Sequence, residues 1–308
     1  MRKLIIDTDT ASDDAIALVL ALRCPDVKVE AVTTVAGNVP VEAATRNAMV
    51  SIAMADSYRP PVYRGCGQPL WRRQITAQQV HGQDGLGDRG YPDPGIPLER
   101  EHAADAIARL VQENEGIDIV TLGPLTNLAM AVRLYPQAMS KVRSITAMGG
   151  QYRQLNPHWP CSEFNILVDP EAAQILLGAG IHITFVPLDV CFGAAAFDRQ
   201  ELDALYALGT PQARFFVDCN RTLIDYTLAK YGYEELIMPD PTAMACYLEP
   251  GLALEKKPAF TRCELQSVLA PGELVYDFER RGGEPENSAL VTKIDAERFK
   301  KMIFDCCR

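Results

Sequence analysis

Short apolar runs alternate along most of the chain with longer stretches in which apolar positions recur at helical spacing. Such alternation is typical of parallel strands joined by crossover helices. The pattern therefore predicts an α/β fold: a doubly wound, mostly parallel open sheet with helices on both faces. The strand-like runs are "KLIID", "VKVEAVTTV", "PPVYRG", "IDIVTL", "VRSITAM" and "IHITFVPL", and the helical stretches cover about 12–23, 41–55, 103–112, 125–134 and 170–177.

Two stretches break this alternation. Residues 66–100 are rich in glycine, proline and polar groups, and so long a loop in a compact domain is usually a lid or a binding loop. Residues 197–232 have an all-helical pattern, and from residue 257 onward short strand-like runs end in a helix. With no internal repeat or clear linker, the 308 residues are expected to form a single domain over 1–308.

Composition narrows the possible partners. A formal net charge of -10 and a pI near 5.0 argue against nucleic acid, because binding to a phosphate backbone requires clustered Lys and Arg. No apolar stretch reaches the ~18 to 20 residues of a membrane span. Nine scattered cysteines with no C-x-x-C pair and no secretory leader indicate reduced thiols in a cytoplasmic protein. We therefore expect a small-molecule ligand, no nucleic acid and no membrane.

The most informative stretch is "LIIDTDTASDDAIALVLAL" at residues 4–22, which places Asp7, Asp9, Asp13 and Asp14 within eight positions after an apolar run. Like charges this close repel, so the cluster implies a cation, a shared proton or a hydrogen-bonded ligand. In open parallel sheets, ligands bind beyond the carboxyl ends of the strands. A chemical site is therefore expected where the first strand ends.

Local structure accounts for part of this cluster. Ser12 is predicted to cap the first helix, which places Asp13 and Asp14 in its first turn, where the helix dipole favours negative charge. Capping does not explain Asp7 and Asp9. These two are separated by one residue at a strand end, and the pleat is expected to point both to one side of the sheet.

Two known acidic motifs are alternatives. The register of an EF-hand loop fails, because it needs an oxygen ligand at Ala11, a glycine at Ser12 and a glutamate at Leu18. The haloacid dehalogenase-like phosphatase motif D-x-D-x-T matches "IIDTDT" in all but its last residue, with Asp7 as the nucleophile. That match leaves "ASDDAIAL" unexplained.

A longer match covers the whole stretch. The pattern D-T-D-x-x-x-D-D-A-x-A-L resembles the N-terminal fingerprint of the inosine-uridine nucleoside hydrolase family. Four further segments resemble the family in the same order: "TTVAGN", "GPLTNLAMA", "EFNILVDPEAA" and "PDPTAMAC", which begin at residues 33, 123, 163 and 239. The resemblance extends from about residue 3 to the C-terminal helix.

The resemblance implies a Ca²⁺ site and a reaction. By similarity, the calcium ligands are Asp9, Asp14, the backbone carbonyl of Leu122, and Asp240, and such oxygens are the ligands that calcium prefers. The implied reaction is hydrolysis of the N-glycosidic bond of a ribonucleoside to free base and ribose. A metal-bound water loses its proton to Asp9 as it attacks the anomeric carbon. Family members are commonly homodimers or homotetramers.

The resemblance also implies contacts to the sugar. Simple structural roles remain open for some of them: Asn38 as a turn residue and Met148 as core, while Asp169 is expected to cap a helix rather than bind a ligand. The implied sugar contacts are Asp13, Asn165 and Asn38 for the ring hydroxyls, Asn156 and Glu163 for the 5′-hydroxyl, and Met148 and Phe164 for packing.

The chain departs from the family pattern on the side of the base. Many members carry a histidine, the acid for the departing base, where this chain has Pro239. Our first hypothesis is that His81 donates that proton, and our second is that an aromatic sandwich raises the proton affinity of the base. Purine or pyrimidine preference stays open, as does a ribose-binding relative without catalysis. The aromatic candidates are Trp159, Tyr226, Tyr231 and Tyr233.

Overall fold

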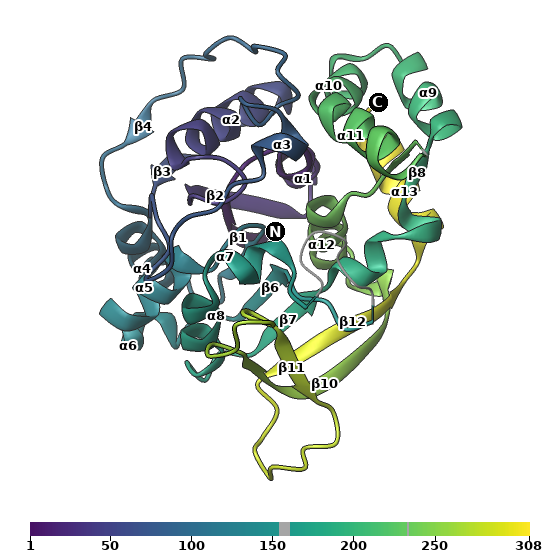
Figure 1. Cartoon of the computed structure of the whole chain (residues 1–308). Coiled ribbons are helices and arrows are strands. Elements are labelled where there is room, and N and C mark those ends of the chain that lie inside the picture. Colours follow the sequence, from purple (N-terminus) through teal and green to yellow (C-terminus); the bar gives the residue numbers. More distant parts are fainter. Residues whose placement is uncertain (154–160, 233) are drawn as a thin grey trace.

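The computed structural model describes residues 1–153, 161–232 and 234–308, and its central feature is a ten-stranded sheet (Figure 1). The strands in chain order are β1 (Arg2–Thr8), β2 (Val27–Thr34), β3 (Val62–Arg64), β4 (Leu98–Glu99), β5 (Asp118–Thr121), β6 (Ser144–Met148), β7 (Ile183–Val186), β10 (Ala253–Cys263), β11 (Leu274–Asp277) and β12 (Ser288–Ile294). Their order in the sheet is β11-β10-β12-β7-β6-β5-β1-β2-β3-β4. All neighbours are parallel except β10, which pairs antiparallel with β11 and β12.

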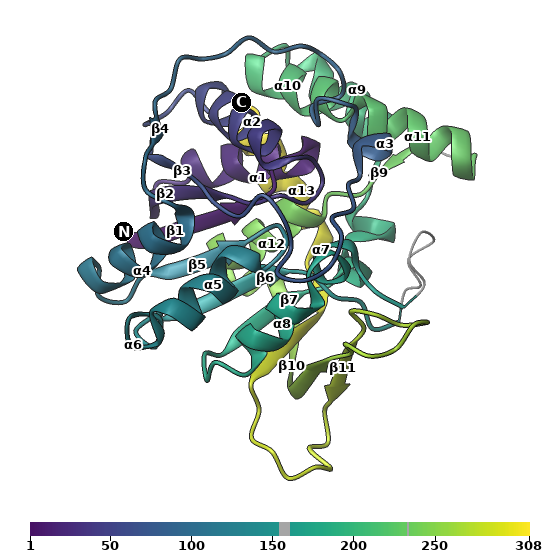
Figure 2. The same ribbon diagram turned by 60° about the vertical axis from the view of Figure 1, so that its left-hand side comes forward.

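Helices cover both faces of this sheet (Figure 2). One face carries α1 (Ser12–Leu22), α2 (Val41–Met54), α12 (Pro239–Leu248) and α13 (Ala296–Cys306), and the other carries α4 (Ala103–Glu113), α5 (Thr126–Leu134), α6 (Pro136–Met139) and α8 (Pro170–Leu177). Every residue of α1 is buried, because α2 and α12 pack on it as well as the sheet. The predicted doubly wound α/β fold with a mostly parallel open sheet is confirmed.

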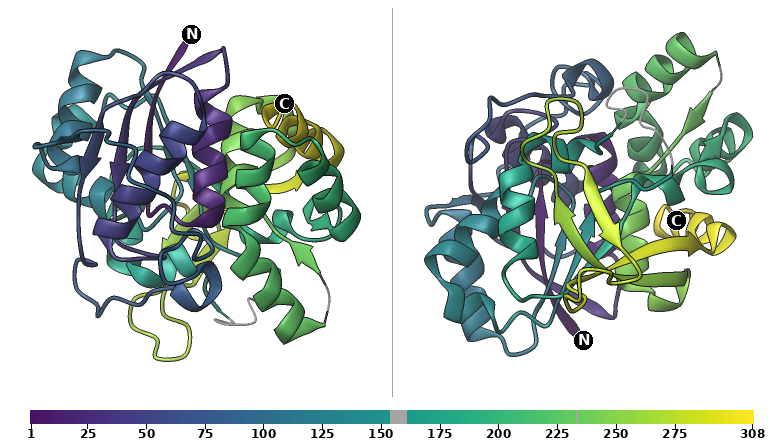
Figure 3. Two further views of the ribbon diagram at one scale, coloured as in Figure 1. Left: turned by 90° about the horizontal axis from the view of Figure 1, so that it is seen from above. Right: turned by 60° about the horizontal axis from the view of Figure 1, so that its bottom comes forward.

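A group of three helices lies to one side of the sheet (Figure 3). It comprises α9 (Arg199–Ala207), α10 (Pro211–Cys219) and α11 (Arg221–Tyr231), with a two-stranded sheet of β8 (Phe197–Asp198) and β9 (Glu235–Leu236) beside them. The all-helical prediction for this region is therefore right except at its start, where β8 pairs with β9. The long loop over residues 66–100 contains only the short helix α3 (Gln78–His81) and the edge strand β4.

The winding of the sheet reverses between β5 and β1. From β1 the chain proceeds outward through β2, β3 and β4, and from β5 it proceeds the other way through β6 and β7. The register pairs Asp7 with Thr33 on one side and with Thr121 on the other, so the three strands end at one level. Such a switch point leaves a crevice at the carboxyl ends of the strands, and ligands bind there in open α/β sheets.

Two further expectations concern the chain as a whole. All nine cysteines are unpaired, as their scattered positions predict. No helix in residues 1–153, 161–232 and 234–308 has the combination of length and apolar content needed to cross a bilayer.

Candidate active site

Asp9 lies directly beyond the end of β1, in a pocket made by two glycines. Its Oδ2 accepts a hydrogen bond from the backbone N–H of Asn38 at 2.6 Å. A Cβ added to Gly37 would lie 2.0 Å from Oδ2, and one added to Gly123 would lie 2.7 Å from Oδ1. Both positions therefore require glycine, because the backbone approaches the carboxylate too closely for any side chain. Within the described residues, the buried Oδ1 has no hydrogen-bond partner.

Asp7 occupies a separate environment. Its Oδ1 accepts hydrogen bonds from Thr33 Oγ1 at 2.6 Å and from Asn127 Nδ2 at 2.8 Å. Burial raises the pKa of this carboxyl to about 7. Our prediction that the pleat points Asp7 and Asp9 to one side is wrong in its premise, because β1 ends at Thr8 and Asp9 is no longer part of the strand.

Three more carboxylates meet above this strand end. Asp13 and Asp14 lie in the first turn of α1, and Asp240 lies in the first turn of α12. One oxygen from each lies within 4.8 Å of the other two. Asp14 is fixed by the hydroxyl of Thr8 at 2.5 Å and by the backbone N–H of Ala11 at 2.9 Å.

The start of α1 differs from the prediction. The N-cap is Ala11, and Ser12 is the first helical residue, so the predicted capping role of Ser12 is wrong. The side chain of Asp14 reaches back to the Ala11 backbone instead. The Ser12 hydroxyl lies 2.8 Å from Nδ1 of His81, at the end of α3. The pattern of a serine before two acidic residues is the same whether the serine caps its own helix or bonds a residue distant in the sequence.

The electrostatics of this cluster are those of a cation site. Burial, and then repulsion by Asp14, raises the pKa of Asp9, and burial followed by the other aspartates raises that of Asp240. Burial is also the main cause of the raised pKa values of Asp13 and Asp14. The buried Oδ1 atoms of Asp9 and Asp13 have no hydrogen-bond partner in the described residues. Carboxylates with unused oxygens fit a hard divalent cation, which would neutralise them.

The predicted ligand set overlaps this cluster without matching it. Asp14 and Asp240 belong to the group of three carboxylates, whose third member is Asp13, while Asp9 lies beside it and is coupled to Asp14 by charge. The family resemblance assigned Asp13 to a sugar hydroxyl. The structure adds it as a potential metal ligand.

The carbonyl of Leu122 lies where β5 ends, beside β1. The carbonyl oxygen accepts a hydrogen bond from Asn165 Nδ2 at 2.7 Å, and the Leu122 N–H donates to the backbone oxygen of Asp7 at 2.8 Å. Asn165 Nδ2 also lies 3.3 Å from the Met148 carbonyl oxygen and 3.3 Å from the Met148 sulfur. The structure thus brings together Asn165, Met148 and Leu122, which come from three separate segments.

Glu163 is the N-cap of the short helix α7 (Phe164–Val168). Its Oε1 accepts the N–H of Asn165 at 2.9 Å, and its Oε2 accepts those of Gly150 and Ile166 at 3.3 Å each. The side chain is buried, and this burial raises its pKa to about 7 despite the three donors. Phe164, the next residue, is half-buried.

This environment predicts an unusual pH dependence of stability. Since the folded pKa of Glu163 exceeds its ordinary value of 4.5, the folded state binds the proton more tightly, and stability falls as pH rises from about 4.5 to 7. A shift of this size corresponds to at most about 3 kcal/mol. Urea unfolding at pH 5 and pH 7.5 should therefore show a smaller loss of stability for Glu163→Gln than for the wild type. Equal losses in the two proteins would contradict this assignment.

The residues predicted to face the base are placed only in part. Burial lowers the pKa of His81 to about 4, so the ring is neutral at pH 7. Tyr226 lies on α11 and contacts Lys230 through its hydroxyl, at 2.9 Å, and through its ring. Asn156, Trp159 and Tyr233 lie outside the described residues, and the side chain of Tyr231 does too.

Two simpler predictions concern Asp169 and Asn38. Asp169 is the N-cap of α8 and accepts the N–H of Ala172 at 3.0 Å, as expected. Asn38 is buried and acts on Asp9 through its backbone, a contact that side-chain patterns do not reveal.

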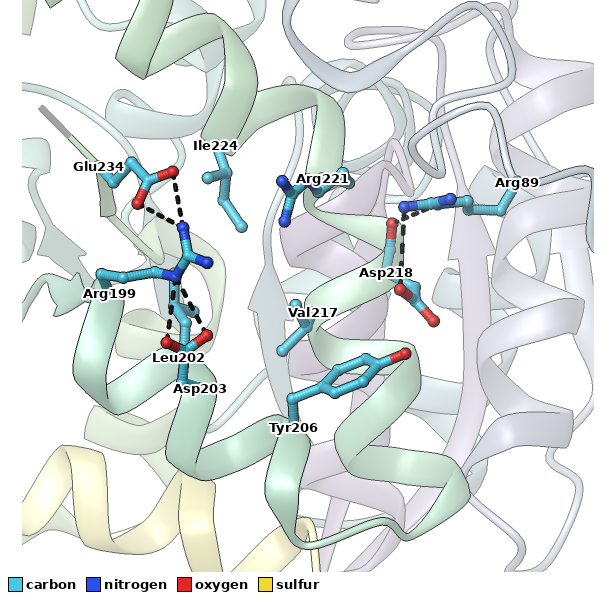
Figure 4. A pocket seen from close by; sticks show the side chains of 10 residues that line it. All are labelled: Arg89, Arg199, Leu202, Asp203, Tyr206, Val217, Asp218, Arg221, Ile224 and Glu234. Carbon is cyan, nitrogen blue, oxygen red and sulfur yellow. Dashed lines mark hydrogen bonds and ion pairs between the residues drawn. The ribbon is translucent and has the colours of Figure 1, made fainter. Parts of the chain in front are cut away.

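A cavity of about 210 Å³ lies among α9, α10 and α11 (Figure 4). Arg199 lies between Asp203 and Glu234, at 3.1 and 2.8 Å, and Arg89 lies 3.8 Å from Asp218. These two arginines are therefore paired with acidic neighbours, and none of the predicted site residues whose side chains the structure describes lines the cavity. This cavity is not the candidate active site.

A doubly wound sheet with buried carboxylates at its switch point defines a small-molecule enzyme of the metal-dependent type. The family model "Inosine-uridine preferring nucleoside hydrolase" matches residues 4–301. The chain belongs to this family, and the protein is a hydrolase that acts on N-glycosyl bonds. Members act on small nucleosides and depend on a metal, so the phosphatase alternative is set aside.

Similar proteins support the assignment along the whole chain. The chain is 33% identical over 312 residues to the inosine-uridine preferring nucleoside hydrolase of Crithidia fasciculata, covering 99% of this chain and 96% of that relative. It is also 33% identical over 311 residues to the pyrimidine-specific ribonucleoside hydrolase RihA of Shewanella sp. (strain ANA-3), covering 99% and 95%. Among solved structures, a plant nucleoside hydrolase superposes with a TM-score of 0.93 at 28% identity, covering 99% of this chain and 98% of that one.

Proposed function

We propose that this protein is a calcium-dependent hydrolase that cleaves the N-glycosidic bond of ribonucleosides to give free base and ribose. The observation that carries the proposal is the meeting of Asp13, Asp14 and Asp240, with Asp9 beside them, at the switch point of the sheet. Among the described residues, the leading causes of the pKa shifts at the four carboxyls include no Lys or Arg that would compensate these charges. A divalent cation supplies that compensation.

The residues fit calcium. Asp9, Asp14, Asp240 and the Leu122 carbonyl offer only oxygen, and calcium takes six to eight oxygen ligands in flexible geometry, including waters and hydroxyls. When bound, the ion would grip the ribose diol and make the attacking water more acidic. The carboxylates then need no protons to remain buried together.

Asp9 is proposed to accept the proton of the attacking water. Its Oδ2 is occupied by the Asn38 N–H, and its Oδ1 is free of partners in the described residues. Gly37 and Gly123 fix the carboxylate from both sides, so it does not rotate away from the sugar. A base held in this way contributes through proton abstraction as the oxocarbenium-like state forms.

The sugar is proposed to be held by side chains from several segments. Asn165, fixed on Leu122 and Met148, would bind a ring hydroxyl together with Asp13. Glu163 combines its capping role with a contact to the 5′-hydroxyl. The further contacts we propose are Asn38 for the ring, Asn156 for the 5′-hydroxyl, and Met148 and Phe164 for packing.

The departing base requires a different donor from the family pattern. Pro239 opens α12 and has no side-chain proton, so we propose His81 as the group that meets the base. Stacking by Trp159, Tyr226 or Tyr231 is the second means of stabilising it. The relatives carry names with pyrimidine-specific and inosine-guanosine preferences, so they leave the base open. We further propose a single domain over residues 1–308, assembled as a homodimer or homotetramer in the cytoplasm.

The direct test is incubation of the protein with calcium and inosine, uridine, cytidine or adenosine, with free reducing sugar as the readout. We expect ribose release from at least one of the four. Nucleoside binding without any release would instead identify a ribose-binding relative, to which the missing histidine points. Absence of both binding and release would contradict the proposal.

A further inference from the structure

Ser12 lies where three segments of the site meet. It opens α1 directly before Asp13, and its hydroxyl lies 2.8 Å from His81 Nδ1. Its backbone oxygen accepts hydrogen bonds from Asn220 Nδ2 and Cys219 Sγ, both at 3.4 Å, at the junction of α10 and α11. The residue is completely buried, so its hydroxyl needs a partner inside the protein. Among the described residues, His81 is that partner.

The loop that follows His81 is held in place independently of this hydrogen bond. The carboxylate of Asp84 accepts three backbone N–H groups within residues 86–90. The side-chain amide of Asn47 donates to the backbone oxygen of Asp84 at 2.8 Å and to the backbone oxygen of Thr10 at 3.0 Å. The loop is therefore tied to the segment before Ser12, and loss of the serine hydroxyl alone should leave its path intact.

Among the described residues, the His81 ring is hydrogen-bonded through one of its two nitrogens. In the described residues, Nδ1 has the Ser12 hydroxyl and Nε2 has no hydrogen-bond partner. Asp13 Oδ1 lies 3.9 Å from Nδ1, so the bonded edge of the ring faces the acidic cluster. Nε2, on the other edge, is left for a partner from outside.

We propose that Ser12 is a positioning residue: its hydroxyl donates to Nδ1 of His81 and thereby directs the hydrogen of the neutral ring to Nε2, which meets the departing base. When the glycosidic bond breaks, its electron pair goes to the base nitrogen. A hydrogen bond from Nε2–H stabilises this charge until the base takes a proton from water. The proposal rests on the proposed function, since it needs a ribonucleoside in the site.

The test compares two ribosides with different leaving groups in wild type and Ser12→Ala. The purine base of inosine leaves as a basic anion, whereas nitrophenolate from p-nitrophenyl β-D-ribofuranoside is stable without a donor at neutral pH. We expect Ser12→Ala to lower kcat/KM for inosine at least about tenfold and that for the nitrophenyl riboside less than about twofold. A merely structural role would lower both equally, and this result would overturn the inference.

A double-mutant cycle adds a second readout. If Ser12 acts through His81, Ser12→Ala should have no further effect on inosine hydrolysis in a His81→Ala background. Additive losses would overturn the inference. Ser288→Ala is the matched control, because Ser288 is an equally buried, hydrogen-bonded serine on β12, and it should leave the ratio of the two substrates unchanged. A wild type inactive on both ribosides and on uridine, cytidine and adenosine would refute the proposed function itself, and the inference with it.

Discussion

Replacement of Asp9 by asparagine is expected to lower kcat for ribonucleoside hydrolysis about 10³-fold. Asparagine has the same shape and keeps an oxygen for the Asn38 N–H, but it accepts no proton from water. Gly37 and Gly123 pack against this side chain, so the asparagine should occupy the same position. The measurement is ribose release at saturating nucleoside and calcium.

A matched control separates this loss from damage to the fold. Asp169 is also a completely buried aspartate, but it caps α8, a role that asparagine fills well. Asp169→Asn should retain kcat within about threefold. Without calcium, Asp9→Asn should unfold at the same temperature as the wild type or higher, since it removes one of several repelling charges. Retention of more than a tenth of the wild-type kcat by a folded Asp9→Asn protein would exclude Asp9 as the base.

Replacement of Asp240 by alanine is expected to weaken calcium binding more than about 100-fold, because loss of even an outer-shell partner of a metal typically costs 10- to 100-fold. Ribose release should disappear at micromolar calcium and return in part at millimolar calcium. Asp240 comes from α12, far along the chain from Asp9 and Asp14, so this variant tests the long-range part of the site.

Asp240→Ala should be more stable than the wild type without calcium and less stable than the wild type with calcium. Without calcium, burial and mutual repulsion raise the pKa values of the four carboxyls, so removing one charge should raise the unfolding temperature. With calcium, the wild type gains stability by binding, and Asp240→Ala does not. Thermal unfolding of both proteins, with and without calcium, checks this crossing. The same order under both conditions would contradict a shared cation site.

The fold was largely predictable from the sequence, because its signals are local. Apolar runs and helical periods depend on neighbouring residues, and they place α1, α2, α4, α5 and α8 within about two residues of their observed bounds. The position of the site also followed from a general rule, since ligands bind at the carboxyl ends of parallel strands. The order of the strands did not follow, because no local pattern shows that β12 pairs with β7.

Contacts between distant segments set the limits of prediction in the site. Gly37 and Gly123 are required only because Asp9 packs against both, and nothing in their own surroundings shows this. Ser12 resembles a helix cap in sequence, yet its hydroxyl meets His81, 69 positions away. The resemblance predicted that Asp14 and Asp240 meet, whereas the inclusion of Asp13 in their cluster required coordinates.

The most direct test of the account is a calcium titration of chelator-treated protein by calorimetry. We expect one Ca²⁺ bound per chain, release of protons from the buried carboxyls on binding, and ribose release that depends on the bound ion. A chain that takes up no calcium, or one that releases ribose at full rate after the chelator has removed all metal, would contradict it.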